Sequence, residues 1–163
     1  MTALPMMSFG EAVKTCFKKY VDFSGRARRS EYWWFQVLNL ILCACMTAVC
    51  IWKITAGDKL EAQVSSAIFD QEKMDALMAQ ANTIDNTFYL LMGLICIIWL
   101  VLVLPGLAVT VRRLHDIGKS GWFILLCFIP YVNFIGGIVI FIFTVMDSKP
   151  EENKFGPSPK YIS

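Results

Sequence analysis

Three long stretches of the chain carry no charged side chain, and they limit the fold more than any other feature. Residues 32–52, 87–111 and 120–146 hold 21, 25 and 27 residues and none of the 15 basic and 13 acidic groups. About 20 helical residues cross the hydrocarbon core of a bilayer, so each stretch is long enough for a membrane span. The sequence therefore predicts an all-α integral membrane protein and excludes an ordinary soluble domain.

The segments between these stretches are too short to form a soluble domain. They are an N-terminal piece of 31 residues and the segments 53–86, 112–119 and 147–163. Chains below about 40 residues rarely build a stable core alone, so we expect one small membrane domain over residues 1–163. The net charge of +2 gives no indication of nucleic-acid binding. The six cysteines lie mainly in apolar stretches without metal-ligand spacing, and we expect no metal ion and no cofactor.

The N-terminal piece predicts an amphipathic helix over residues 8–20. Ser8 and Glu11 have the spacing of a capping box, in which each side chain satisfies a free backbone N–H at the helix start. Apolar residues fall on one arc of this helix and lysines on the other. Two environments remain open for the apolar arc, namely the membrane interface and the neighbouring protein segments.

Apolar positions in the loop 53–86 recur in alternating steps of four and three, interrupted only by Gln71. This spacing predicts an amphipathic helix over about residues 59–81. Packing on the membrane surface or on the protein's own spans is favoured over a coiled coil, because three heptads with two alanines make a weak seam.

The third stretch, 120–146, contains Pro130 in its middle and is too short to cross the membrane twice. It is interpreted as either one kinked span or a re-entrant segment, and the side of the tail depends on which is formed. Asn133 is the amide in the middle of this stretch, and amides in lipid need partners, so we expect it to face protein.

The distribution of Lys and Arg predicts the orientation. The N-terminal piece holds six basic residues, and segment 112–119 holds three basic residues against one acidic residue. Loop 53–86 holds three basic residues against six acidic ones. By the positive-inside rule, the N-terminus and segment 112–119 face the cytoplasm and loop 53–86 is the outer loop.

The scarce charges are concentrated beside the predicted spans and form a candidate site, here called the charge cluster. Its members are Arg26, Arg28, Arg29, Glu31, Arg112, Arg113, His115, Asp116 and Lys119. Three roles are open for it: a structural charge network, binding of anionic lipid or a partner protein, and ligand transport or chemistry. His115 beside Asp116 could titrate near neutral pH, but the sequence offers neither a third metal ligand nor a catalytic triad.

Three motifs in this chain resemble those of one protein family. They run from Phe23 to Trp33 (FSGRARRSEYW), from Arg112 to Trp122 (RRLHDIGKSGW) and from Asn153 to Pro159 (NKFGPSP). In this order they resemble the domain of unknown function 805 family of YhaH-type bacterial inner-membrane proteins. The resemblance implies a multi-pass protein of the bacterial inner membrane and implies no known reaction.

Together these observations favour a non-enzymatic membrane module that binds lipid headgroups or a membrane partner through the charge cluster. The lipid bilayer, including its anionic lipids, is the expected partner, and a second membrane protein or copy of the chain is also open. The alternative function is a small transporter or channel subunit with Asn133 on its path. The spans contain no charged residue, whereas ion and proton paths usually use such groups.

Overall fold

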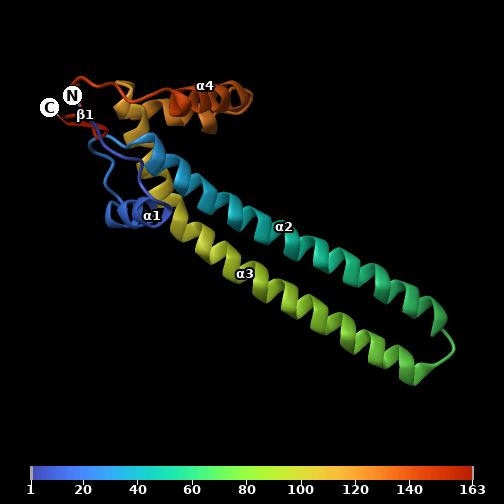
Figure 1. Ribbon diagram of the computed structural model, residues 1–163. Helices are drawn as coiled ribbons and strands as arrows, with labels where there is room; N and C mark the ends of the chain where they lie inside the picture. Colours follow the sequence, from blue (N-terminus) through green and yellow to red (C-terminus); the bar gives the residue numbers. More distant parts are fainter. Residues whose placement is uncertain (1, 163) are drawn as a thin grey trace. The chain divides into compact units, whose positions relative to one another are not determined.

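The computed structural model describes residues 2–162, and nearly all of its regular structure is α-helical (Figure 1). Helices α2 (Arg29–Ser66) and α3 (Gln71–Asp116) contain the first two uncharged stretches and are long and apolar enough to cross a membrane. The predicted all-α membrane architecture is therefore confirmed. The shorter elements are β1 (Thr2–Ala3), α1 (Phe9–Lys18), the 3-10 helix η1 (Gly121–Phe128), α4 (Asn133–Val145) and β2 (Tyr161–Ile162).

The chain is divided into two compact units. The terminal unit comprises Met1–Leu38 and Val101–Ser163, and the hairpin unit comprises Asn39–Leu100. The start of α2 and the end of α3 belong to the terminal unit, and the turn between these helices belongs to the hairpin unit. All three sequence motifs therefore lie in the terminal unit.

The hairpin unit differs from the separate outer-loop helix predicted over residues 59–81. The chain turns at residues 67–70, and the two arms run antiparallel as continuations of α2 and α3 (Figure 1). The Asp70 carboxylate caps α3 by accepting a hydrogen bond from the Lys73 backbone N–H at 3.1 Å. Each arm has apolar residues at helical spacing. The periodic pattern therefore continues across the turn and resembles the pattern of a single helix.

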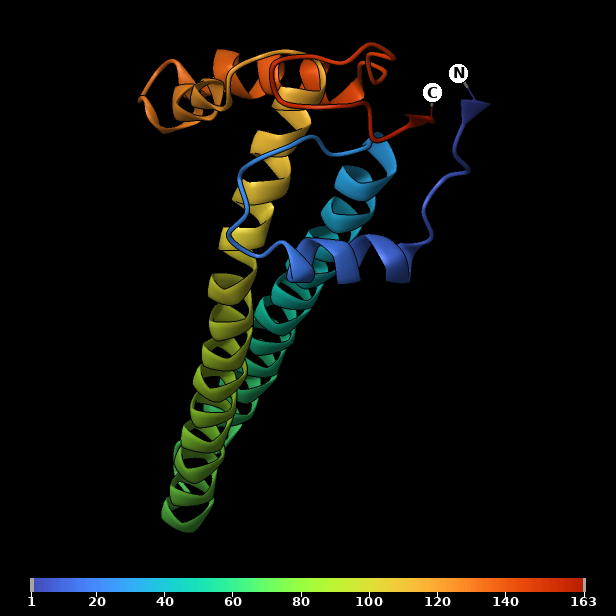
Figure 2. The same cartoon turned by 90° about the vertical axis from the view of Figure 1, so that its left-hand side faces the viewer.

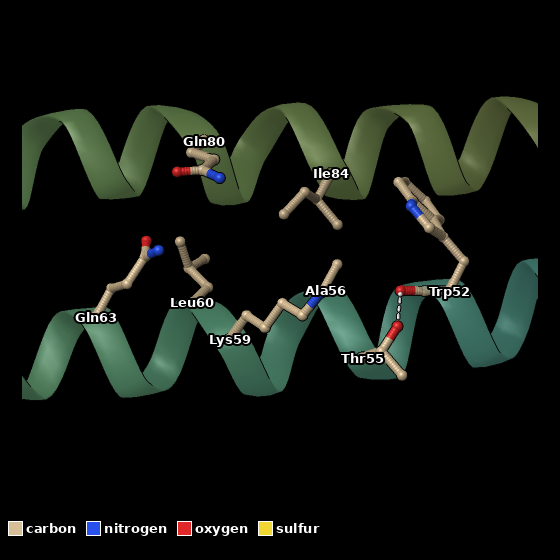
Figure 3. Close-up of a pocket in the computed structure, with 8 residues that line it drawn as sticks. All are labelled: Trp52, Thr55, Ala56, Lys59, Leu60, Gln63, Gln80 and Ile84. Carbon is tan, nitrogen blue, oxygen red and sulfur yellow. Dashed lines mark hydrogen bonds between the residues drawn. The ribbon is translucent and has the colours of Figure 1, made fainter.

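Side chains from both arms meet within the hairpin unit. Figure 3 shows Leu60 and Ile84 pointing between the arms beside Gln63 and Gln80. These side chains line a groove of about 200 Å³. An ion pair also joins the arms, with Lys53 Nζ 3.0 Å from an Asp85 carboxylate oxygen. Contacts between side chains thus hold the polar ends of the two long helices together.

The third uncharged stretch forms two short helical elements in place of one continuous span. Between η1 and α4 the chain turns through Tyr131, whose φ is 67°. The two elements then pack so closely that a Cβ added at Gly136 would lie 2.9 Å from the Leu126 carbonyl oxygen. With 13 residues, α4 is roughly 20 Å long and does not match the roughly 30 Å hydrocarbon core.

The tail returns to the N-terminal segment of the terminal unit, as both views show (Figures 1 and 2). Strands β1 and β2 pair antiparallel, with Ala3 opposite Tyr161. The Leu4 backbone N–H continues this pairing by donating to the Lys160 carbonyl oxygen at 2.8 Å. Backbone hydrogen bonds therefore join the N-terminal segment to the tail.

Helix α1 begins with the predicted capping box. The Ser8 backbone N–H donates to the Glu11 carboxylate at 2.9 Å, and the Glu11 N–H donates to the Ser8 hydroxyl at 3.4 Å. Ala12 and Cys16 are buried on one side of the helix. The small side chains of these two residues allow α1 to lie close to the segments that carry the first motif.

Candidate functional site

Asp116 at the end of α3 lies between two guanidinium groups. Arg26 Nε donates to one carboxylate oxygen at 2.9 Å, and Arg113 pairs with the other oxygen. All three side chains are almost completely buried. Two buried cations therefore share one buried anion, and the remaining positive charge has to be stabilised by other oxygen atoms.

Backbone carbonyl groups of the tail and of the end of α4 supply those oxygen atoms. The Arg26 guanidinium donates to the carbonyls of Lys149 at 2.6 Å, Glu151 at 2.8 Å and Gly156 at 3.2 Å. Arg113 donates to the Thr144 carbonyl at 3.3 Å and also to the carbonyl of Met146. The two arginines therefore connect the first motif to the tail and the second motif to the end of α4 through hydrogen bonds that depend on backbone position.

A second buried ion pair lies beside α1. Arg112 Nη2 is 3.2 Å from a Glu31 carboxylate oxygen, and both side chains are buried. This geometry is an ion pair without a hydrogen bond, and within residues 2–162 neither Nη atom of Arg112 has a hydrogen-bond acceptor. The Cys16 thiol points at the same Glu31 oxygen from 4.0 Å. Burial, together with the Glu31 charge, raises the pKa of Cys16 to about 12, so this thiol stays protonated and is a poor nucleophile.

His115 joins all three motifs through its ring and its backbone. The imidazole stacks on Phe155 of the tail with ring centres 3.8 Å apart, and its Nδ1 lies 3.3 Å from the Gly25 carbonyl oxygen. The Asn153 amide donates to the His115 carbonyl at 3.0 Å. His115 lies outside the spans, four residues beyond the second uncharged stretch. Burial of the imidazole lowers the pKa of His115. The neutral ring, with a proton on Nδ1, fits this arrangement as a donor to Gly25.

Each motif contains one glycine with a positive φ, at a turn where the chain changes direction. These are Gly25 at 75°, Gly118 at 79° and Gly156 at 114°. A side chain at such a position strains the backbone, so glycine permits the three turns that direct the motifs toward one another. The Ala27 N–H also donates to the Arg112 carbonyl at 3.0 Å, which fixes the first motif to the end of α3.

The remaining predicted site residues lie at the periphery. Arg28 is half-buried and donates to the carbonyls of Leu4 and Pro5 at 2.9 and 2.8 Å. Arg29 and Lys119 are exposed. Asn133, which we expected to contact protein, is instead exposed in the first turn of α4, because this turn follows directly on the bend at Tyr131. The charge cluster is thus a buried network with an exposed margin.

Sequence reasoning did not assign a role to several residues of the network. Cys16, Asn153 and Phe155 take part through their side chains, and Lys149 and Glu151 through their carbonyl groups. Asn153 and Phe155 could have been singled out because they belong to the third motif. No sequence signal marks a backbone carbonyl as an arginine acceptor.

The side chains of the network mainly contact other segments of the chain. Among the residues that the structure describes, no three His, Cys, Asp or Glu side chains are placed to hold one metal ion. His115 donates toward a backbone carbonyl and stacks on a ring, so both contacts of its side chain join segments of the chain. The chemistry that the network supports best is the holding of chain segments.

Two long apolar helices, and a buried ion-pair network in the unit that contains the N-terminal segment and the tail, define a small helical integral membrane protein. The family described as "Protein of unknown function (DUF805)" matches residues 20–157, and the chain belongs to this family. The chain is 33% identical to the inner membrane protein YhaH of Escherichia coli (strain K12) over 147 residues, which cover 88% of this chain and 91% of that protein. It is also 34% identical to the inner membrane protein YhaI of the same strain over 146 residues, which cover 90% and 92% of the two chains. No solved structure matches the chain.

Proposed function

We propose that the chain is a non-enzymatic protein of the bacterial inner membrane whose terminal unit binds anionic phospholipid headgroups at the cytoplasmic face. The relatives named as inner membrane proteins support the location. The count of Lys and Arg beside the spans supports the orientation. The observation that carries the proposal is the contrast between a buried network, whose arginines face carboxylates and backbone carbonyls, and an exposed margin of cations and aromatic rings.

Helix α1 shows this contrast most clearly. Its small residues Ala12 and Cys16 pack inward, whereas Phe9 and Phe17 are 39% and 41% exposed. Lysines of the same helix, Lys14 and Lys18, are also exposed. Exposed aromatic rings next to lysines suit the boundary between acyl chains and anionic headgroups.

The buried network changes which charges can bind lipid. Arg26, Arg112 and Arg113 have no route to a headgroup, since their side chains are enclosed and already face carboxylates or carbonyls. We infer that they hold the terminal unit together and that headgroups contact the exposed members of the cluster and the α1 lysines. The buried network therefore holds the proposed binding surface in place but is not part of that surface.

Lipid retention tests this function. The double variant Lys14→Gln/Lys18→Gln of the full chain, purified in mild detergent, should retain at least about tenfold less anionic phospholipid than the unchanged chain. A lysine near an anionic surface contributes about 1 kcal/mol to binding, so two lysines account for a change of this size. The measurement is mass-spectrometric quantification of bound phosphatidylglycerol.

The matched control is Lys59→Gln/Lys73→Gln, which removes two exposed lysines of the hairpin unit. Equal retention by both variants would contradict the proposal, and co-purification of a protein in place of lipid would indicate a protein partner.

The proposed topology makes a separate prediction. Reporters fused at the N-terminus and after residue 163 should both be active in the cytoplasm, since β1 pairs with β2 and the Arg26 side chain binds the tail. A reporter inserted after Phe69 in the hairpin turn should be active on the opposite side. Alkaline phosphatase and a fluorescent protein report the two compartments. Activity of the N- and C-terminal fusions on opposite sides would show that the third stretch spans the membrane.

A further inference from the structure

We propose that one groove of the terminal unit binds a single anionic phospholipid, with the phosphate at its polar end and the upper acyl chain at its apolar end. The groove encloses about 540 Å³ and is lined by the N-terminal segment, the first turns of α2 and the tail. Ligand pockets commonly span roughly 300–1,000 Å³. This inference rests on the proposed function and specifies its ligand and its site.

The charges of the groove fit an anion. Arg28, Arg29 and Lys160 line it together with one carboxylate, that of Asp147. Lys160 Nζ lies 2.8 and 2.6 Å from the two carboxylate oxygens, and Arg28 is occupied with backbone carbonyls. The exposed guanidinium of Arg29 is therefore the group best placed to meet a phosphate, with Lys160 as a second donor.

One residue of the groove wall has a hydroxyl group without a hydrogen-bond partner among residues 2–162. Ser148 lines the groove and is 4% exposed, and within residues 2–162 its Oγ has no hydrogen-bond partner. Buried hydroxyls are almost always hydrogen-bonded, so a water molecule or a ligand oxygen is expected as its partner.

The apolar end of the groove distinguishes a lipid from a soluble phosphate. Trp33 and Val37 lie one helical turn apart on α2, within the first uncharged stretch. Trp34 lines the groove beside them, and tryptophan favours the headgroup level of a bilayer. An acyl chain attached to the bound phosphate would follow this surface toward the membrane interior.

The walls of the groove are held in place without a ligand. The indole N–H of Trp34 donates to the Met7 carbonyl at 2.9 Å, and Trp33 packs edge-on against Phe141 with ring centres 5.9 Å apart. The pairing of Leu4 with Lys160 closes the groove between the N-terminal segment and the tail. A preformed site loses less conformational entropy on binding, which favours specific retention of one lipid.

Titration of the full chain with phosphatidylglycerol and phosphatidylcholine in detergent, followed by native mass spectrometry, tests this site. Arg29→Gln should weaken phosphatidylglycerol binding about tenfold, the loss expected for one charge-assisted hydrogen bond, and should weaken phosphatidylcholine binding less, because the choline cation offsets the charge of its phosphate. Asp147→Asn should strengthen phosphatidylglycerol binding severalfold, because it removes the one carboxylate near the phosphate while keeping the shape. Both residues are exposed, so both variants are expected to fold.

The two substitutions have opposite expected signs, and this makes the outcome decisive. Unchanged phosphatidylglycerol affinity in both variants would overturn the proposal that the groove binds the lipid. If the α1 lysine variant still loses lipid in that case, the proposed function stands without the groove site. If neither the groove variants nor the α1 variant changes lipid binding, both ideas fail. Displacement of phosphatidylglycerol by an equal concentration of glycerol phosphate would show a phosphate site without an acyl chain and would overturn the lipid assignment.

Discussion

Asp116→Asn is expected to destabilise the terminal unit by about 3–5 kcal/mol, the usual cost of removing one partner from a buried ion pair. The amide has nearly the shape of the carboxylate, so the packing changes little. Its charge is absent, however, and the guanidiniums of Arg26 and Arg113 are left buried beside a neutral group. The amide NH₂ also faces one of these donors, and two donors cannot form a hydrogen bond with each other.

Exposure of Cys16 measures this loss directly. The thiol is buried beside Glu31 and its pKa is raised to about 12, so a maleimide reacts with it only when the terminal unit opens. In a chain whose other five cysteines are alanine, Asp116→Asn should increase the labelling rate by at least a hundredfold, since each 1.4 kcal/mol is about a factor of ten.

A matched substitution controls for the chemistry of the change. Asp85→Asn removes a carboxylate from the partly exposed pair with Lys53 in the hairpin unit. Exposed pairs contribute at most about 1 kcal/mol, so this variant should leave the labelling of Cys16 nearly unchanged. Similar labelling rates for both variants would contradict a stabilising role of the buried network.

The spans and the N-terminal cap could be predicted because they depend on local sequence. Absence of charge over 20 or more residues specifies a membrane environment, and the Ser8–Glu11 spacing specifies a helix start. The outer-loop helix was wrong in its boundaries, because two antiparallel arms can share one periodic pattern. The Asp70 cap was the local signal that marks the turn between them.

The sequence singles out the arginines and carboxylates of the buried network, but it does not specify how they are connected. The sequence indicates that Arg26, Glu31 and Asp116 lie beside spans on the same side of the membrane. Which guanidinium faces which carboxylate depends on the turns at Gly25 and Gly118, and positions in a linear sequence do not specify these angles. Burial of the arginines depends in addition on the returning tail, whose contacts are made by backbone atoms.

The second large effect is expected from loss of the contacts between Arg26 and the tail. Arg26→Met should release the tail from the terminal unit, since three tail carbonyls lose a charged donor at once. Hydrogen bonds to charged groups contribute about 1.5–3 kcal/mol each, so the combined loss exceeds the effect of an exposed arginine many times over. Asp116 keeps its contact with Arg113, and the end of α3 is therefore expected to persist.

Limited proteolysis of the chain in lipid nanodiscs separates release of the tail from general unfolding. A nonspecific protease should remove the tail from Arg26→Met about a hundredfold faster than from the unchanged chain and should cleave the hairpin turn at Phe69 at the same rate in both. Arg26→Lys keeps the positive charge but has a single nitrogen at its end, so it should restore only part of the protection. Full protection in Arg26→Lys would show that charge alone holds the tail, and full protection in Arg26→Met would show that the strand pairing of β1 and β2 suffices.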